Sequence, residues 1–91
     1  MPTREEVAEA VKRLLAEKAG IKPEDVQDSR KLTEWPLTFD SIALGFVAID
    51  LRKYARKYNP NASVTGAMVR KTGLTVAKLI DLIYNVMQLT S

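Results

Sequence analysis

The sequence predicts an all-α fold, a small four-helix bundle with a long loop between the first two helices and a short third helix. Apolar residues recur at helical spacing in three separate segments, and each segment is bounded by capping residues, glycine or proline. Apart from short β-branched stretches, no segment competes as a strand. With 91 residues, 46% of them hydrophobic, we expect a single domain, 1–91, around one modest core.

The first helix is expected to begin at Thr3, which can form a capping box with Glu6. Gly20 is expected to end it, because glycine accepts the left-handed conformation that helix C-termini favour. Between these ends, four apolar residues share one helical face. They are Val7, Val11, Leu14 and Leu15.

Residues 21–39 are expected to form a long connection that contains Pro23 and Pro36. Connections of this length in small domains are usually functional or carry a short turn of their own. Its apolar side chains are expected to pin the loop onto the core. They are Ile21, Val26, Leu32, Trp35 and Leu37.

The second helix is expected to begin at Asp40 and to end before Asn59-Pro60, because the residue before a proline avoids helical geometry. Phe39 and Leu44 have the spacing of a hydrophobic staple. At about 100° per residue, one side of this helix should face the core. Its residues are Leu44, Val47, Leu51, Tyr54, Ala55 and Tyr58.

Two further helices are expected in the C-terminal part. A short helix lies within residues 62–73 and is stopped by Gly73. The last helix starts at Thr75, with Leu74 and Leu79 as a second staple. Its core face comprises Val76, Leu79, Ile80, Ile83 and Met87.

The second helix also carries an apolar stripe on the side opposite its core face, formed by Ile42, Phe46 and Ile49. Such a stripe either binds a partner or is covered within the molecule, here by the long loop through Trp35 or Leu37. Both readings stay open. Gly45 inside the helix costs about 1 kcal/mol relative to alanine, which suggests a close approach by a partner or ligand.

The composition excludes several kinds of site. The chain has no cysteine and no histidine, so it lacks a thiol nucleophile, a thiolate metal site and the commonest general base. We therefore expect neither an autonomous enzyme nor a metal site. The apolar runs are too short to span a bilayer, and the N-terminus lacks the apolar region of a signal peptide. A cytoplasmic protein without membrane insertion is expected.

The net charge of +3 is unevenly distributed. Up to Ser41 the chain has 7 basic and 9 acidic residues, a balance of −2. From Ile42 onward it has 7 basic and 2 acidic residues, a balance of +5. A basic half indicates an anionic partner, which need not be nucleic acid.

The segment "FDSIALGFVAIDL" resembles the acyl carrier protein family, whose signature is Asp-Ser-Leu at the start of the second helix. The resemblance extends to the first amphipathic helix, the long loop and the final helix "LTVAKLIDLIYNV". It therefore covers residues 4–86, nearly the whole chain. It implies a bundle of the acyl-carrier type.

The resemblance implies that Ser41 receives 4′-phosphopantetheine from coenzyme A, with Asp40 as the motif residue and helix cap. The arm would carry acyl groups as thioesters in a specialised fatty-acid, lipid or polyketide pathway. The implied partners are a phosphopantetheinyl transferase, which supplies base and magnesium, and acyl-loading, acyl-transfer or condensing enzymes. The helix N-terminus would favour the phosphodiester anion by about 0.3–1 kcal/mol. The carrier itself is expected to be a non-catalytic monomer.

The chain departs from the family in three respects. Ile42 replaces the usual leucine, and Thr38-Phe39 stand where a pair containing glycine usually precedes the motif. The second helix, typically acidic in the family, is basic here, and Phe46 replaces a common acidic contact. We therefore expect dedicated partners, since like charges oppose association with enzymes that select an acidic helix.

Two residue sets follow from the combination of pattern and resemblance. The expected docking residues are Ile42, Phe46, Ile49, Arg52, Lys53 and Arg56. An acyl chain in this family can retreat between the helices, and its candidate lining here is Val47, Leu51, Met68, Val69, Leu79 and Ile83. These six are in any case ordinary core positions in the unloaded protein.

Other functions compete with this one. Asp40 and Ser41 can simply cap the helix, and an aminoacyl or peptidyl carrier of a nonribosomal pathway shares the motif. "LRKYARKY" also fits a small basic module that binds nucleic acid, although the core-facing spacing of Tyr54 and Tyr58 weakens that reading. A protein-interaction domain that has lost its modification is a further alternative.

Overall fold

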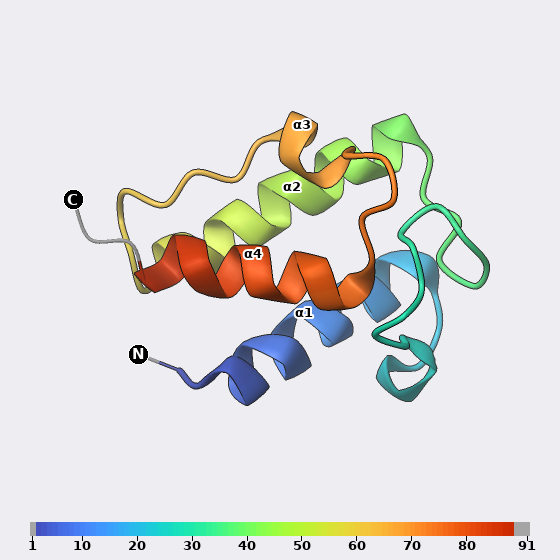
Figure 1. Ribbon diagram of the computed structural model, residues 1–91, viewed down its shortest axis with the longest axis horizontal. Helices are drawn as coiled ribbons and strands as arrows, with labels where there is room; N and C mark the ends of the chain where they lie inside the picture. The colour runs from blue at the N-terminus through green and yellow to red at the C-terminus, as the bar shows by residue number, and fades with distance from the viewer. Residues whose placement is uncertain (1, 89–91) are drawn as a thin grey trace.

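A computed structural model describes residues 2–88 of the chain. It confirms the all-α prediction, with three long helices, one short helix and a long loop after the first helix (Figure 1). The helices are α1 (Arg4–Ala19), α2 (Ser41–Arg56), α3 (Gly66–Val69) and α4 (Val76–Gln88), and a 3₁₀ turn, η1 (Pro23–Asp25), lies in the loop.

The three long helices pack around one core. α1 contacts both α2 and α4, α2 also contacts α4, and α3 packs on α2. α2 and α4 run in the same general direction and α1 runs opposite to them (Figure 1). This arrangement places the first turn of α2 beside the long loop, at the end of the molecule away from the N-terminus (Figure 1).

The predicted ends of α1 are confirmed. The hydroxyl of Thr3 accepts a hydrogen bond from the Glu6 backbone N–H at 3.2 Å, and the Glu6 carboxylate accepts from the Thr3 N–H in return. Gly20 takes the left-handed conformation with φ 72° and donates its N–H to Ala16 O. These local signals define the helix because they satisfy its otherwise unpaired backbone groups.

The predicted core faces are largely confirmed. Every predicted core residue of α4 is buried, and α1 buries Val7, Val11 and Leu15 with Leu14 half-buried. α2 buries Leu44, Val47, Leu51 and Ala55. The prediction that Tyr58 belongs to this face was wrong, because α2 ends at Arg56 and the Tyr58 side chain is 47% exposed.

The loop of residues 20–40 is held by backbone as well as side chains. Leu32 donates its N–H to Leu74 O at 3.3 Å, and Phe39 donates to Leu32 O at 3.0 Å. Val26, Leu32 and Leu37 are buried as predicted, and Ile21 is half-buried. These bonds tie the loop to the segment before α4, and so fix where α2 begins.

The prediction that Trp35 pins the loop was wrong, because its side chain is 74% exposed. Glu34 donates its N–H to Lys31 O, and Leu37 donates its N–H to Glu34 O, so the chain turns tightly here. These turns bring Leu32 and Leu37 into the core and leave the indole between them facing solvent.

No helix within residues 2–88 has both the length and the apolar character that crossing a membrane requires.

Candidate functional site

The candidate site is built on the first turn of α2. Asp40 has extended backbone geometry, and its carboxylate accepts a hydrogen bond from the Ala43 N–H at 2.7 Å. Ser41 follows as the first helical residue and is exposed, and its hydroxyl makes no hydrogen bond within residues 2–88. Capping is therefore done by Asp40 alone. The Ser41 hydroxyl is left accessible for chemistry.

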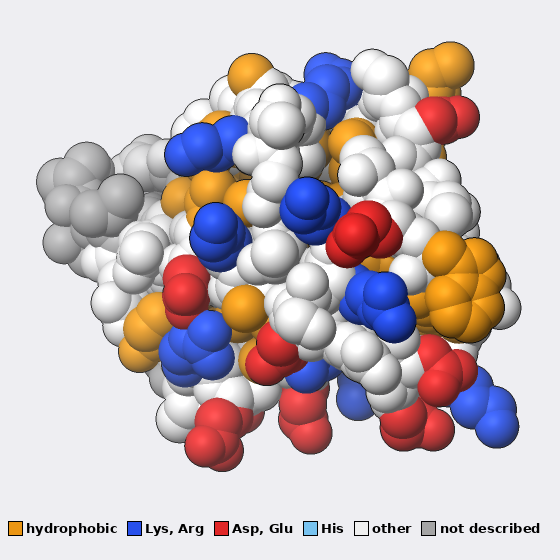
Figure 2. Space-filling view, turned by 45° about the vertical axis from the view of Figure 1, so that its right-hand side comes forward, with side chains coloured by type: hydrophobic (Ala, Val, Ile, Leu, Met, Phe, Trp, Pro, Cys, Tyr) orange, Lys and Arg blue, Asp and Glu red, His pale blue; other side chains and the backbone are white. Residues whose placement is uncertain are grey.

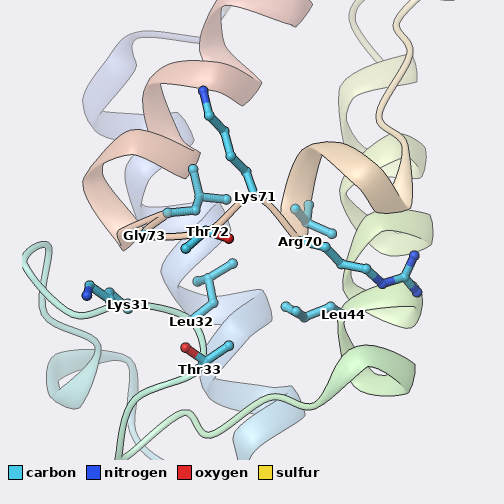
Figure 3. A pocket seen from close by; sticks show the side chains of 10 residues that line it. Lys31, Leu32, Thr33, Leu44, Arg70, Lys71, Thr72 and Gly73 are labelled. Atoms are coloured by element: carbon cyan, nitrogen blue, oxygen red, sulfur yellow. The ribbon is translucent and has the colours of Figure 1, made fainter.

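Arg70, at the end of α3, reaches this first turn. Its Nε and Nη2 donate hydrogen bonds to the backbone carbonyl of Ser41 at 3.2 and 2.8 Å. Figure 3 shows the Arg70 side chain extending from α3 toward α2. A guanidinium cation is thereby held next to the candidate serine. Sequence reasoning missed this residue, because nothing local to position 70 indicates a contact 29 positions away.

Two glycines make room for that guanidinium. A Cβ added at Gly45 would lie 3.0 Å from Arg70 Nη2, and a Cβ added at Gly66 would collide with Arg70 Nη1. The sequence suggested that Gly45 permits a close approach by a partner or ligand. The close approach in the structure is made by Arg70, a side chain of the protein itself.

Thr38, three residues before Ser41, has a left-handed backbone with φ 46°. This region is strained for a β-branched residue and easily adopted by glycine. Thr38 thus holds a backbone conformation that glycine would adopt more easily. The turn into α2 is kept at the cost of local strain.

Replacing Thr38 by glycine is expected to raise the free energy of unfolding by about 1 kcal/mol. The left-handed conformation costs an ordinary residue about 1–2 kcal/mol, and the greater freedom of glycine in the unfolded chain offsets part of the gain. Urea unfolding followed by circular dichroism measures the change. Thr33→Gly is the control, because Thr33 has no positive φ and should lose stability. A Thr38→Gly variant that is less stable than the original protein would show that the backbone at Thr38 is not strained.

A pocket of about 260 Å³ lies between the long loop and the α3–α4 connection. Its apolar residues are Leu32, Leu44, Val69 and Leu74, and its cations are Lys31, Arg70 and Lys71. Leu32 and Leu44 approach each other across it (Figure 3). Because Arg70 borders the pocket and also bonds Ser41 O, the pocket adjoins the candidate site.

The predicted acyl-lining residues divide into two groups. Val47, Leu51, Leu79 and Ile83 are completely buried in the core, and Met68 is half-buried. Only Val69 lines the pocket beside Ser41. That these residues accommodate an acyl chain stays a prediction.

The predicted docking stripe on α2 is open to solvent. Ile42 is 72% exposed, Phe46 56% and Ile49 40%, so the long loop does not cover them. Lys53 and Arg56 are also exposed, whereas Arg52 is half-buried.

Lys18 of α1 flanks the stripe, which the sequence did not indicate. Its ammonium nitrogen lies 2.7 Å from a carboxylate oxygen of Asp50 and 5.8 Å from the ring centre of Phe46. Asp50 is the one acidic residue on α2 itself. Its charge is therefore compensated where it borders the stripe.

Charged side chains of both signs cover the face of the molecule that Figure 2 shows. In Figure 2, acidic side chains gather along the lower edge, where α1 lies in Figure 1. Above that edge, lysine and arginine side chains alternate with acidic ones (Figure 2).

The two tyrosines near the end of α2 pack edge to face, with ring centres 5.6 Å apart. Burial, the neighbouring Tyr58 and Glu6 together raise the pKa of Tyr54 above its ordinary value. Tyr58 is too exposed for the core role that was predicted for it, so that argument against a nucleic-acid module holds only for Tyr54.

No protein-family model matches this chain, and neither the curated proteins nor the solved structures contain a significant match.

Proposed function

We propose that the protein is a carrier that holds acyl intermediates as thioesters on a 4′-phosphopantetheine arm attached to Ser41. The observation that carries the proposal is the exposed, unbonded Ser41 hydroxyl directly after the Asp40 cap. The resemblance of "FDSIALGFVAIDL" to the acyl carrier motif supplies the chemistry. The chain itself provides no histidine to act as base, so a transferase must activate the serine.

In the proposed modification, Ser41 Oγ attacks the phosphorus of coenzyme A that bears the pantetheine. The new bond joins Oγ to phosphorus, the pyrophosphate bond of coenzyme A breaks, and adenosine 3′,5′-bisphosphate leaves. The base of the transferase takes the hydroxyl proton. The phosphodiester then lies at the N-terminus of α2, where backbone N–H groups favour an anion.

Arg70 supports the proposal through charge. Its guanidinium is held beside Ser41 by the two hydrogen bonds to the Ser41 carbonyl. A cation fixed at the backbone of Ser41 would attract the negative charge of a phosphodiester on that residue. The pocket beside it, apolar within and cationic at its edge, suits the polar arm and the start of a carbon chain.

Incubation with coenzyme A and a promiscuous phosphopantetheinyl transferase is expected to add a single phosphopantetheine to the protein, detected by intact-protein mass spectrometry. Ser41→Ala should show no increase in mass. Ser29→Ala removes another exposed hydroxyl and should be modified like the original chain. Failure of the folded protein to accept the arm from any transferase tried would overturn the proposal.

A further inference from the structure

One face of α2 is covered by no other element. Ile42, Phe46, Ile49 and Lys53 follow each other at positions i, i+4, i+7 and i+11 and are all exposed. We call these four residues the α2 seam. This spacing is the one along which two helices pack side by side. The seam starts at the residue after Ser41, so anything docked on it lies next to the site.

The charges beside the seam that no carboxylate compensates are positive. Lys53 ends it, Arg56 lies one turn beyond Arg52 on the same side of the helix, and Lys18 covers the opposite edge. Within residues 2–88, neither Lys53 nor Arg56 forms an ion pair with a carboxylate. Asp50 is already paired with Lys18. A docked partner therefore meets uncompensated positive charge from Lys53 and Arg56 at one end of the apolar line, and a neutral ion pair at its edge.

We propose that the α2 seam binds an amphipathic helix of a partner protein whose own apolar seam is bordered by aspartate and glutamate. The inference rests on the proposed function, because a partner that acts on a group tethered to Ser41 must dock beside it. Opposite charges at the edges accelerate association and exclude partners with a basic rim. The apolar line supplies the contact area, which the charges alone would not.

Two other kinds of partner fit this surface less well. A nucleic acid would need cations along its phosphates and exposed aromatic faces for its bases, but Phe46 is the one aromatic residue of the seam and Lys18 lies over its ring. A membrane would need an apolar face free of carboxylates, but the Lys18–Asp50 ion pair borders the seam. Burying that pair in lipid would cost free energy.

The test uses the whole protein and a synthetic helical peptide of three heptads. Each heptad of the peptide has leucine at its two apolar positions, a and d, and glutamate at the positions that flank them, e and g. A second peptide replaces every glutamate by lysine. Fluorescence anisotropy is expected to show binding of the glutamate peptide about tenfold tighter than that of the lysine peptide, and weaker at high salt. Amide shifts in heteronuclear NMR spectra are expected to concentrate on residues 42–57.

Matched variants assign the binding to the seam. Phe46→Ser and Lys53→Glu should each weaken binding of the glutamate peptide about tenfold. Arg13→Glu makes the same charge change at an exposed residue of α1 and should change it less than about twofold. Circular dichroism checks that each variant is folded, which is expected because the replaced side chains lie at the surface.

Several outcomes would overturn the proposal. They are absence of binding, equal binding of the two peptides, and a Lys53→Glu effect no larger than that of Arg13→Glu. Binding to phosphatidylglycerol vesicles or single-stranded DNA that depends on Phe46 and Lys53 would assign the surface to a different partner. Ser41→Ala should bind the peptide unchanged. Peptide binding without phosphopantetheine attachment would contradict only the proposed carrier function. Attachment without peptide binding would contradict only the proposal that the α2 seam binds an acidic helix.

Discussion

Leu51→Ala is expected to lower the free energy of unfolding by about 3 kcal/mol, within the usual range of about 2–5 kcal/mol for such a change. The Leu51 side chain is completely buried on α2, the helix that contacts α1, α3 and α4. Truncating this side chain removes buried apolar surface from the core. It also leaves a cavity, because the surrounding helices can relax only partly to fill it. A domain of this size has only about 5–14 kcal/mol of total stability, so urea unfolding will show the loss clearly.

Two controls separate this cavity from other effects. Leu51→Met conserves most of the volume and should cost less than about 1.5 kcal/mol. Ile42→Ala also shortens an aliphatic side chain of α2, but at a position that is 72% exposed, and should change stability by less than about 0.5 kcal/mol. A Leu51→Ala loss as small as that of Ile42→Ala would contradict the buried position of Leu51.

If Ser41 accepts the proposed phosphopantetheine arm, the same variant tests the predicted acyl site when the thermal midpoint is measured again with an octanoyl group on that arm. A chain that enters the core beside Leu51 fills the new cavity, so octanoylation should raise the midpoint of Leu51→Ala more than that of the original protein. A chain held in the pocket at Leu32 and Leu44 would raise both midpoints equally. Equal shifts would therefore place the acyl group outside the predicted core positions.

The helices of this chain could be predicted because their signals are local. Thr3 with Glu6, Gly20 and Asp40 each satisfy backbone groups within four residues, and the structure uses all of them. The core face of α4 follows from its period alone, since every residue of that face is buried. Ser41 was singled out by the resemblance of its motif to that of the acyl carrier family, and the structure leaves it exposed after the Asp40 cap. That Ser41 is modified stays a prediction.

The missed features depend on contacts between distant segments. Arg70 bonds Ser41 O across 29 positions, and Lys18 reaches Asp50 from another helix. Trp35 is a large apolar residue of the kind that anchors a loop to a core. The tight turns around it nevertheless leave its side chain facing solvent. The helical period predicts which residues share a face only within the helix itself. Tyr58 lies beyond the end of α2, so its assignment to the core face of that helix was wrong.

Asn59 is a second feature that the sequence left undefined, because the residue was noted only for preceding a proline. Among residues 2–88 it is the single buried polar or charged residue, with 7% of its surface exposed. Its Nδ2 donates to Val86 O in the last turns of α4 at 2.9 Å, and its Oδ1 accepts from the Asn61 N–H at 3.1 Å. One amide thereby joins the segment that follows α2 to α4.

Asn59→Ala is expected to lower the free energy of unfolding by about 2 kcal/mol. The change leaves a carbonyl of α4 and a loop N–H without their side-chain partner, and a buried polar group left unpaired costs about 1–3 kcal/mol. Asn85→Ala removes the same amide from an exposed position of α4, where the better helix propensity of alanine should make it neutral or stabilising. Equal effects of the two substitutions in urea unfolding would show that the Asn59 amide does not hold α2 and α4 together. A selective loss of stability at Asn59 would instead show that the segment after α2 maintains the bundle, and unchanged phosphopantetheine attachment in this variant would show that the candidate site at the other end of α2 does not depend on it.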